Sequence, residues 1–131
     1  MTDFLAVMPF AASLGITITS AGKDEVVGTL EHSAERTTAG GAMHGGALMT
    51  LADTAGAVCA FLGLPEGART ATTQSGTHLL RAVSGSSGSE VRATARPVHS
   101  GRTQIVVQTD VTDDRGRLVA RTTQTQAVLP A

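Results

Sequence analysis

The sequence is poor in aromatic residues. Its 131 residues include no Trp and no Tyr, and Phe4, Phe10 and Phe61 are the only aromatic side chains. The core of one domain spanning residues 1–131 must therefore be built from small and aliphatic side chains, which bring backbones close together. The net charge is −1 and no basic cluster is present, so the chain lacks both the charge and the stacking surface typical of nucleic-acid binding.

Cysteine and targeting signals are also scarce. Cys59 is the single cysteine, which excludes an internal disulfide and favours a cytoplasmic protein. The four histidines lack the spacing of metal ligands, so we expect neither a metal nor a cofactor. The apolar stretch over residues 4–14 is short and has no basic flank, which predicts no targeting segment and no membrane association.

Charge is nearly absent from residues 37–65. An overall charged share of 16% predicts about five charged residues in a stretch of this length, and Asp53 is the only one present. The Ala-, Leu- and Met-rich part, which ends at Gly63 and Pro65, predicts a helix over residues 46–62. Because this helix is apolar on most sides, it should be buried on most sides.

Strand patterns precede and follow this helix. Strands are expected at residues 16–22, 26–30, 69–81, 90–98, 103–112 and 118–129, with loops at 33–41 and 84–89 and a short helix or cap at 4–14. This order predicts an α+β fold in which an antiparallel sheet wraps around one long central helix. Such a sheet has open edges, and pairing of an edge with a second copy predicts a symmetric dimer.

Two features could carry chemistry. Asp53 is either an acid at a small exposed window of the helix or a carboxylate held in a cleft as nucleophile or general base. His44-Gly45-Gly46 stands where free N–H groups of a helix start could stabilise an oxyanion, although an ordinary loop end with a capping histidine remains the alternative. Gly45 and Asp53 are about 12 Å apart along the helix. If they cooperate, they must belong to different subunits.

The run from His44 to Ala55 resembles the HGG-x6-D/E signature of hotdog-fold acyl-CoA thioesterases, in particular the phenylacetate-pathway and 4-hydroxybenzoyl-CoA thioesterase branch. Residues 72–82, 99–102 and 113–120 are also similar to that family, so the resemblance extends over about residues 16–129. It implies hydrolysis of an acyl-CoA thioester to free acid and CoA at the interface of a homodimer, which in many members pairs again into a homotetramer.

The resemblance also implies roles for individual residues. Asp53 would be the nucleophile or the base that activates water, and the N–H of Gly45 from the partner chain would polarise the thioester carbonyl. His44 would support the loop or the leaving group, and Thr72 would orient water or the carboxylate. Gly46 would allow the substrate to approach closely.

Three positions depart from the family pattern. Thr38 stands where many members have an Asn or Gln that holds water or the thioester, and a hydroxyl has a shorter reach than an amide. Ala57 replaces a Ser or Thr found in some members, and Ala82 replaces a Pro. The loop around Thr38 is therefore expected to be arranged differently, or turnover on the usual substrates to be slow.

The substrate itself requires cationic and apolar contacts. The candidates for the phosphates of CoA are Arg81, Arg96 and Arg102, the last together with Gly101 in a turn, because a guanidinium matches phosphate oxygens. The acyl slot is expected to be aliphatic, around three residues of the charge-poor stretch: Met43, Leu48 and Met49.

Two other functions are compatible with the same residues. One is a non-catalytic module of the same fold that binds acyl-CoA or an acyl carrier, with the altered loop around Thr38 preventing turnover. The other is a hotdog dehydratase or hydratase, which is less favoured because such enzymes pair a catalytic histidine with an acid, whereas His44 precedes two glycines at thioesterase spacing.

Overall fold

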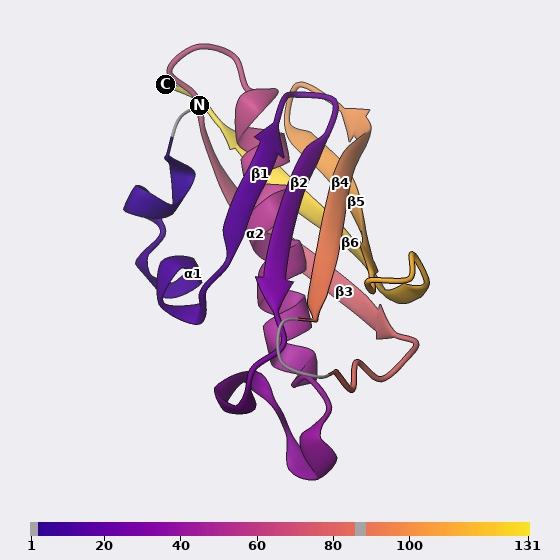
Figure 1. Ribbon diagram of the computed structural model, residues 1–131. Coiled ribbons are helices and arrows are strands. Elements are labelled where there is room, and N and C mark those ends of the chain that lie inside the picture. The colour runs from indigo at the N-terminus through magenta and orange to yellow at the C-terminus, as the bar shows by residue number, and fades with distance from the viewer. Residues whose placement is uncertain (1–2, 86–88) are drawn as a thin grey trace.

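The computed structural model describes residues 3–85 and 89–131 and shows an antiparallel sheet wrapped around one long helix, as predicted (Figure 1). The strands are β1 (Thr17–Ala21), β2 (Val26–Glu31), β3 (Arg69–Leu79), β4 (Glu90–Ser100), β5 (Gln104–Thr112) and β6 (Leu118–Leu129). They are arranged in the order β1-β2-β4-β5-β6-β3, with antiparallel pairing between neighbours. The helix α2 (Gly45–Leu62) packs against all six strands.

The composition of α2 explains its central position. Ala and Gly side chains let the sheet approach closely, while Leu51, Ala55 and Cys59 are almost fully buried against it. The helix is long and apolar enough to span a membrane, but 56% of it is buried inside the fold, which is typical of a core helix. Its end at Leu62, followed by Gly63 as the C-cap, agrees with the prediction, and its start lies one residue before the predicted one.

One stripe of α2 is not covered by the sheet. Met49, Asp53, Ala57 and Phe61 follow one another at four-residue intervals and therefore share one face of the helix. Met49 is 44% exposed and Phe61 is 51% exposed. The charge-poor helix is thus less enclosed within one chain than the sequence predicts, and its open face carries the single acid.

The N-terminal segment lies beside β1 and α2 (Figure 1). It consists of a single 3₁₀ turn, η1 (Phe4–Val7), and the short helix α1 (Pro9–Leu14), which ends where Gly15 adopts a φ of +97°. The guanidinium of Arg36 occupies the space beside Gly15 and donates a hydrogen bond from Nε to the carbonyl of Leu14 at 2.6 Å. The expected short helix is therefore present and anchored to the rest of the chain.

The loops match the predicted positions but contain more structure than expected. Residues 33–41 include two 3₁₀ turns, η2 (Ala34–Arg36) and η3 (Ala39–Gly41), and the loop is held to α2 because the N–H of His44 donates to the carbonyl of Arg36 at 2.8 Å. The second predicted loop, residues 84–89, lies partly outside the described residues, at positions 86–88.

The strand β3 forms one edge of the sheet. It pairs only with β6, and nearly all of its 11 residues are exposed. A long edge strand with unpaired N–H and C=O groups is a template for pairing with another strand. The open edge that the sequence predicts is therefore present, and it borders the exposed stripe of α2 through contacts between α2 and β3.

Candidate active site

The start of α2 holds one available backbone donor. His44 is the N-cap residue, and its Nδ1 accepts a hydrogen bond from the N–H of Gly46 at 2.8 Å. The carbonyl of His44 accepts from the N–H groups of Ala47 and Leu48, at 2.9 and 3.3 Å. Within the described part of the chain, Gly45 therefore has the only N–H of the first turn that lacks an acceptor.

Both glycines at this helix start allow close approach. A Cβ on Gly45 would lie 2.7 Å from Cδ1 of Leu79, and a Cβ on Gly46 would lie 2.9 Å from Nδ1 of His44. The first glycine thus lets the end of β3 pack against the helix start, and the second lets the imidazole fold back as a cap. A larger residue at Gly45 would push the Leu79 side chain aside, and one at Gly46 would displace the imidazole of His44.

His44 is expected to contribute to stability as a cap. The change His44→Ala should lower the free energy of unfolding by about 1 kcal/mol, because the N–H of Gly46 loses its acceptor. His44→Asn should retain most of the stability, since Asn is a good N-cap residue. Urea denaturation at fixed protein concentration measures both, and equal stability of the wild type and the Ala variant would contradict this role.

Asp53 is part of a hydrogen-bond network that extends into the sheet. Its Oδ1 accepts from Nε2 of Gln124 at 3.2 Å and, more weakly, from Oγ1 of Thr72 at 3.5 Å. Thr72 in turn accepts from Nε2 of Gln126 at 2.6 Å, and Oε1 of Gln126 accepts from Thr70 at 3.1 Å. Both contacts to Asp53 end on Oδ1, so within the described residues Oδ2 is the oxygen left to face a substrate.

Sequence reasoning missed the two glutamines of this network. Gln124 and Gln126 are 0% and 1% exposed on β6, so their amides are directed toward the helix rather than toward solvent. The signal was available, because the two-residue period of a strand places them on the same face as the buried Ala120 and Thr122. Their contact with Asp53, however, depends on how the helix packs on the sheet.

A glycine makes room for the Gln124 amide. A Cβ on Gly56 would overlap Oε1 of Gln124, which lies against the backbone of α2 without a hydrogen-bond partner in the described structure. An unpaired buried carbonyl oxygen costs stability. The arrangement is consistent with an amide held in place so that its N–H can reach Asp53.

The predicted catalytic residues thus form two groups within one chain. Thr72 lies beside Asp53, whereas Gly45 is at the other end of the same helical segment, about 12 Å away at 1.5 Å per residue. Thr38 is exposed in the loop before the helix, and its N–H donates to the carbonyl of Ala42 at 2.8 Å.

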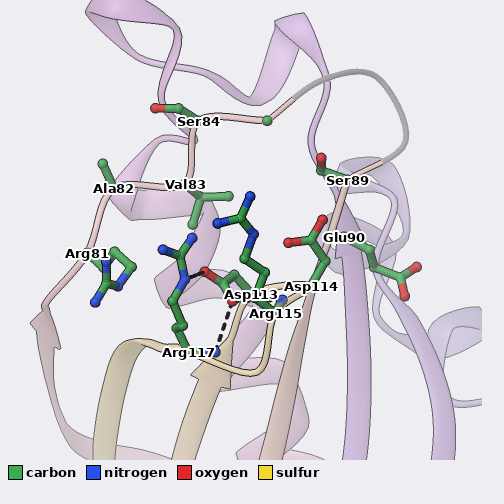
Figure 2. A pocket seen from close by; sticks show the side chains of 11 residues that line it. Arg81, Ala82, Val83, Ser84, Ser89, Glu90, Asp113, Asp114, Arg115 and Arg117 are labelled. Atoms are coloured by element: carbon green, nitrogen blue, oxygen red, sulfur yellow. Dashed lines mark hydrogen bonds and ion pairs between the residues drawn. The ribbon is translucent and has the colours of Figure 1, made fainter.

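A polar cavity of about 410 Å³ lies beyond the end of β3 (Figure 2). Figure 2 shows three arginines in it: Arg81 from the segment after β3, and Arg115 and Arg117 from the β5–β6 turn. Arg81 was predicted from the sequence, whereas the two turn arginines were not. A second cavity of about 290 Å³ continues from Arg81 to the helix start at Gly45.

The carboxylates of the polar cavity differ in their hydrogen bonds and ion pairs. Desolvation opposes ionisation of Asp113, but hydrogen bonds from the N–H groups of Arg117 and Arg115 and from the Arg117 guanidinium hold its pKa below the usual range. Arg117 is thereby committed to Asp113 at 2.8 Å. Among the described residues, Arg81 and Arg115 have no ion-pair partner and are left as the cations that can face a ligand (Figure 2).

The other predicted phosphate contacts lie elsewhere in the chain. Gly101 and Arg102 form the β4–β5 turn, and β5 separates them from the cavity at Arg81 by about 30 Å at 3.3 Å per residue. Arg96 is paired with Glu25 at 2.6 Å. One chain therefore does not bring Arg102 and Arg81 to the same ligand.

The residues expected to form the acyl slot lie in two separate places. Met43 and Leu48 are buried and line the cavity beside Gly45, whereas Met49 is exposed on the stripe that contains Asp53.

Cys59 should not react with thiol reagents in the folded protein. Burial, assisted by the negative charge of Asp24, raises the pKa of the Cys59 thiol to about 11. Ellman's reagent at pH 8 should therefore detect no thiol until the chain is unfolded, and rapid reaction of the native protein would contradict the buried position.

The same thiol should make stability depend on pH. A pKa that is higher in the folded than in the unfolded state means that the folded state holds its proton more tightly, so the stabilisation is complete below pH 9 and is lost between pH 9 and about 11. Urea denaturation across this range should show a steeper decline for the wild type than for Cys59→Ala.

The comparisons with known proteins give the family. The sequence profile of the thioesterase superfamily matches residues 40–120, which include the helix start, Asp53 and most of the sheet. The chain belongs to this superfamily of thioester hydrolases, and its fold is the hotdog fold predicted from the resemblance.

Three relatives show how closely the chain follows that fold. Rv1847 of Mycobacterium tuberculosis, a protein named as an esterase candidate, is 30% identical over 117 residues, which are 87% of this chain and 81% of that protein. Its solved structure superimposes with a TM-score of 0.88, covering 94% of this chain and 98% of that one. The thioesterase HI1161 of Haemophilus influenzae is 30% identical with a TM-score of 0.85, covering 92% and 82% of the two chains.

The third relative carries a ligand. It is a hypothetical thioesterase of Streptococcus pneumoniae solved with coenzyme A, 28% identical with a TM-score of 0.82, covering 97% of this chain and 99% of that one.

Proposed function

We propose that the protein hydrolyses acyl-CoA thioesters to the free acid and CoA in a site made by two copies of the chain. The observation that carries this proposal is that one helix holds both an oriented carboxylate and a backbone N–H without an acceptor among the described residues. Asp53 is held by Gln124 and Thr72, and the N–H of Gly45 has no acceptor among the described residues. These are the base or nucleophile and the oxyanion donor that acyl transfer requires.

The separation of these groups supports a shared site. At about 12 Å along α2, Asp53 and Gly45 of one chain cannot contact the same carbonyl carbon. The open edge of β3 and the exposed stripe of α2 lie side by side, so a second copy paired along β3 would cover both. Two-fold symmetry would then place Gly45 of each chain opposite Asp53 of the other. Further pairing into a tetramer stays a prediction.

The reaction can be written for either role of Asp53. As a base, the carboxylate takes a proton from water, and the water oxygen attacks the thioester carbonyl carbon. As a nucleophile, its oxygen attacks that carbon directly, and water then cleaves the resulting anhydride. In both cases the Gly45 N–H stabilises negative charge on the carbonyl oxygen, the carbon–sulfur bond breaks, and the CoA thiolate leaves and is protonated.

The cavities support a route for CoA. The 290 Å³ cavity beside Gly45 shares Arg81, Ala82 and Val83 with the 410 Å³ polar cavity. A pantetheine arm in the first would bring the phosphates to Arg81 and Arg115 in the second. The CoA bound to the Streptococcus pneumoniae relative supports the same class of substrate. Assignment to the phenylacetate-pathway branch stays a prediction.

Thiol release from acetyl-, hexanoyl-, octanoyl-, benzoyl- and phenylacetyl-CoA tests the proposal. We expect steady hydrolysis of at least one of them, with free acid and CoA in equal amounts by mass spectrometry. Binding of these compounds without release would favour the non-catalytic module instead, and neither binding nor release would contradict the proposed function.

A further inference from the structure

The inner face of β6 carries two glutamines at positions where an apolar side chain would pack more easily. Gln124 and Gln126 are almost fully buried beneath α2. The inner faces of β4 and β5, by contrast, are mostly filled by buried Val, Ala and Ile side chains. A buried amide loses its hydrogen bonds to water, so it is stable only where protein groups replace them. The partners of the two amides therefore indicate what the glutamines do.

The partners of Gln126 fix the direction in which its amide points. Its Nε2 donates to Oγ1 of Thr72 at 2.6 Å, and its Oε1 accepts from Oγ1 of Thr70 at 3.1 Å. Thr72 lies directly opposite Gln126 in the β3–β6 ladder, and the ladder shifts between Thr72 and Gln74. Such a bulge commonly redirects a side chain beside an active site. Thr72 thus receives a hydrogen bond from β6 while its side chain faces the helix.

This direction leaves the hydroxyl proton of Thr72 for Asp53. A hydroxyl group has one proton to donate. Because Oγ1 of Thr72 accepts from Gln126, its own proton can be directed to Oδ1 of Asp53, which is 3.5 Å away. If the amide of Gln126 were reversed, Thr72 would donate to the amide oxygen and Asp53 would lose this donor. The hydrogen bonds therefore run in one direction, from Gln126 through Thr72 to Asp53.

Gln124 reaches the same carboxylate oxygen directly. Its Nε2 lies 3.2 Å from Oδ1 of Asp53, whereas its Oε1 has no partner in the part of the chain that the structure describes. Asp53 itself is exposed, and the terminal torsion of an aspartate is broad, so its own backbone would not fix the plane of the carboxylate. Two donors that converge on one oxygen do fix that plane, and they leave the other oxygen at a defined place.

We propose that Gln124 and Gln126 are positioning residues, which hold Oδ1 of Asp53 directly and through Thr72 so that Oδ2 is presented to the reacting atoms. The inference rests on the proposed thioester hydrolysis and applies whether Asp53 is the base or the nucleophile. Both amides are buried, so they act on the carboxylate and not on the substrate. Such positioning matters because a misplacement of about 1 Å can cost about 100-fold in rate.

Replacement of each glutamine by methionine tests the positioning role. Gln124→Met and Gln126→Met keep a long unbranched side chain but remove the N–H groups. Each variant should lower kcat for acyl-CoA hydrolysis by about 10- to 100-fold. The affinity for the hexyl thioether of CoA, which cannot be hydrolysed, should change little. Unchanged kcat in both variants would overturn the inference, and so would a loss of thioether binding that matches the loss of kcat, because it would show a general structural effect.

A double-mutant cycle tests whether Gln126 acts through Thr72. Thr72→Val removes the hydroxyl and keeps the shape, so Gln126→Met should lower kcat in the wild type but cause no further loss in the Thr72→Val background. Thr72→Ser keeps the hydroxyl and should retain most of the activity. Gln104→Met is the matched control, since Gln104 is an exposed glutamine on β5 and its replacement should leave kcat unchanged. A full additional loss in the Thr72→Val background would overturn the role of Gln126.

The side-chain amide signals of the glutamines in ¹H–¹⁵N spectra separate this inference from the proposed function. Asp53→Ala removes the acceptor of Gln124, and Thr72→Val removes that of Gln126. Each change should move the Nε2 signals of its glutamine and leave those of Gln104 in place. If these shifts are found but no thioester is cleaved, the hydrogen-bond chain stands and the proposed hydrolysis fails. If the shifts are absent while thioesters are cleaved, the proposed function stands and the positioning role fails.

Discussion

Replacement of Asp53 by Asn is expected to lower kcat for acyl-CoA hydrolysis by about 10²–10⁴-fold, the range typical of a lost acid–base group. Asn has nearly the same shape and can remain beside Gln124 and Thr72, but it can neither accept the proton of water nor attack the carbonyl. Thiol release measures kcat, and the affinity for a thioether of CoA should change little. Hydrolysis unchanged in both Asp53→Asn and Asp53→Ala would exclude the carboxylate from the reaction.

The oxygen exchanged in a single turnover distinguishes the two roles of Asp53. With excess enzyme in H₂¹⁸O, a general base delivers the water oxygen to the product acid in the first turnover. A nucleophile instead transfers one of its own oxygens to the first product if water attacks the carboxylate carbon of Asp53. Mass spectrometry of the acid and of the protein would reveal which one takes up the label.

Gly56→Ala is expected to destabilise the protein by about 1–3 kcal/mol, the usual cost of overpacking a core. Destabilisation is an unusual result for this substitution, because Ala is favoured over Gly inside a helix by about 1 kcal/mol. The new Cβ would overlap Oε1 of Gln124, so the amide would be displaced and its hydrogen bond to Asp53 lost. The variant should therefore also hydrolyse thioesters more slowly.

A double-mutant cycle tests whether the overlap with Gln124 causes the destabilisation. In a Gln124→Ala background the overlap is absent, and Gly56→Ala should become neutral or stabilising in urea denaturation at fixed protein concentration. Gly22→Ala is the control, since its Cβ would meet only the carbonyl of Glu25 at an ordinary 3.7 Å. Equal destabilisation by Gly56→Ala in both backgrounds would contradict the packing described for Gln124.

Local patterns in the sequence predicted most of the fold. The charge-poor run produced α2 with a one-residue difference at its start, and the six predicted strands are all present. Periodicity and turn residues act over a few neighbouring positions, so such features can be read along the chain. The central position of the helix followed because an apolar helix needs a sheet around it.

Sequence reasoning proposed only those parts of the candidate site that are local in sequence. His44, Gly45 and Asp53 lie on one helix, so their spacing could be calculated. The contacts of Gln124 with Asp53 and of Arg115 with the cavity at Arg81 join segments far apart in the chain, and no local pattern encodes them.

The separation of Arg102 from Arg81 differs from these long-range contacts, because it follows from the order of the strands. It could have been deduced, because successive turns of an antiparallel sheet alternate between its two ends.

The shared site can be tested with variants that each lose one half of it. Gly45→Pro removes the proposed oxyanion donor, and proline is tolerated at the first position of a helix after the extended backbone of His44. Gly45→Ala adds a Cβ at the same place but keeps the N–H, so it is the matched control. Gly45→Pro and Asp53→Asn should each be inactive as homodimers.

The most direct measurement is the activity of a purified heterodimer of Gly45→Pro and Asp53→Asn chains, co-expressed with different tags. If each site takes Asp53 from one chain and Gly45 from the other, one of its two sites is intact, and about half of the wild-type activity per dimer should return. If both groups act within one chain, each chain is defective and the heterodimer should be as inactive as the two homodimers. That result would contradict the shared site.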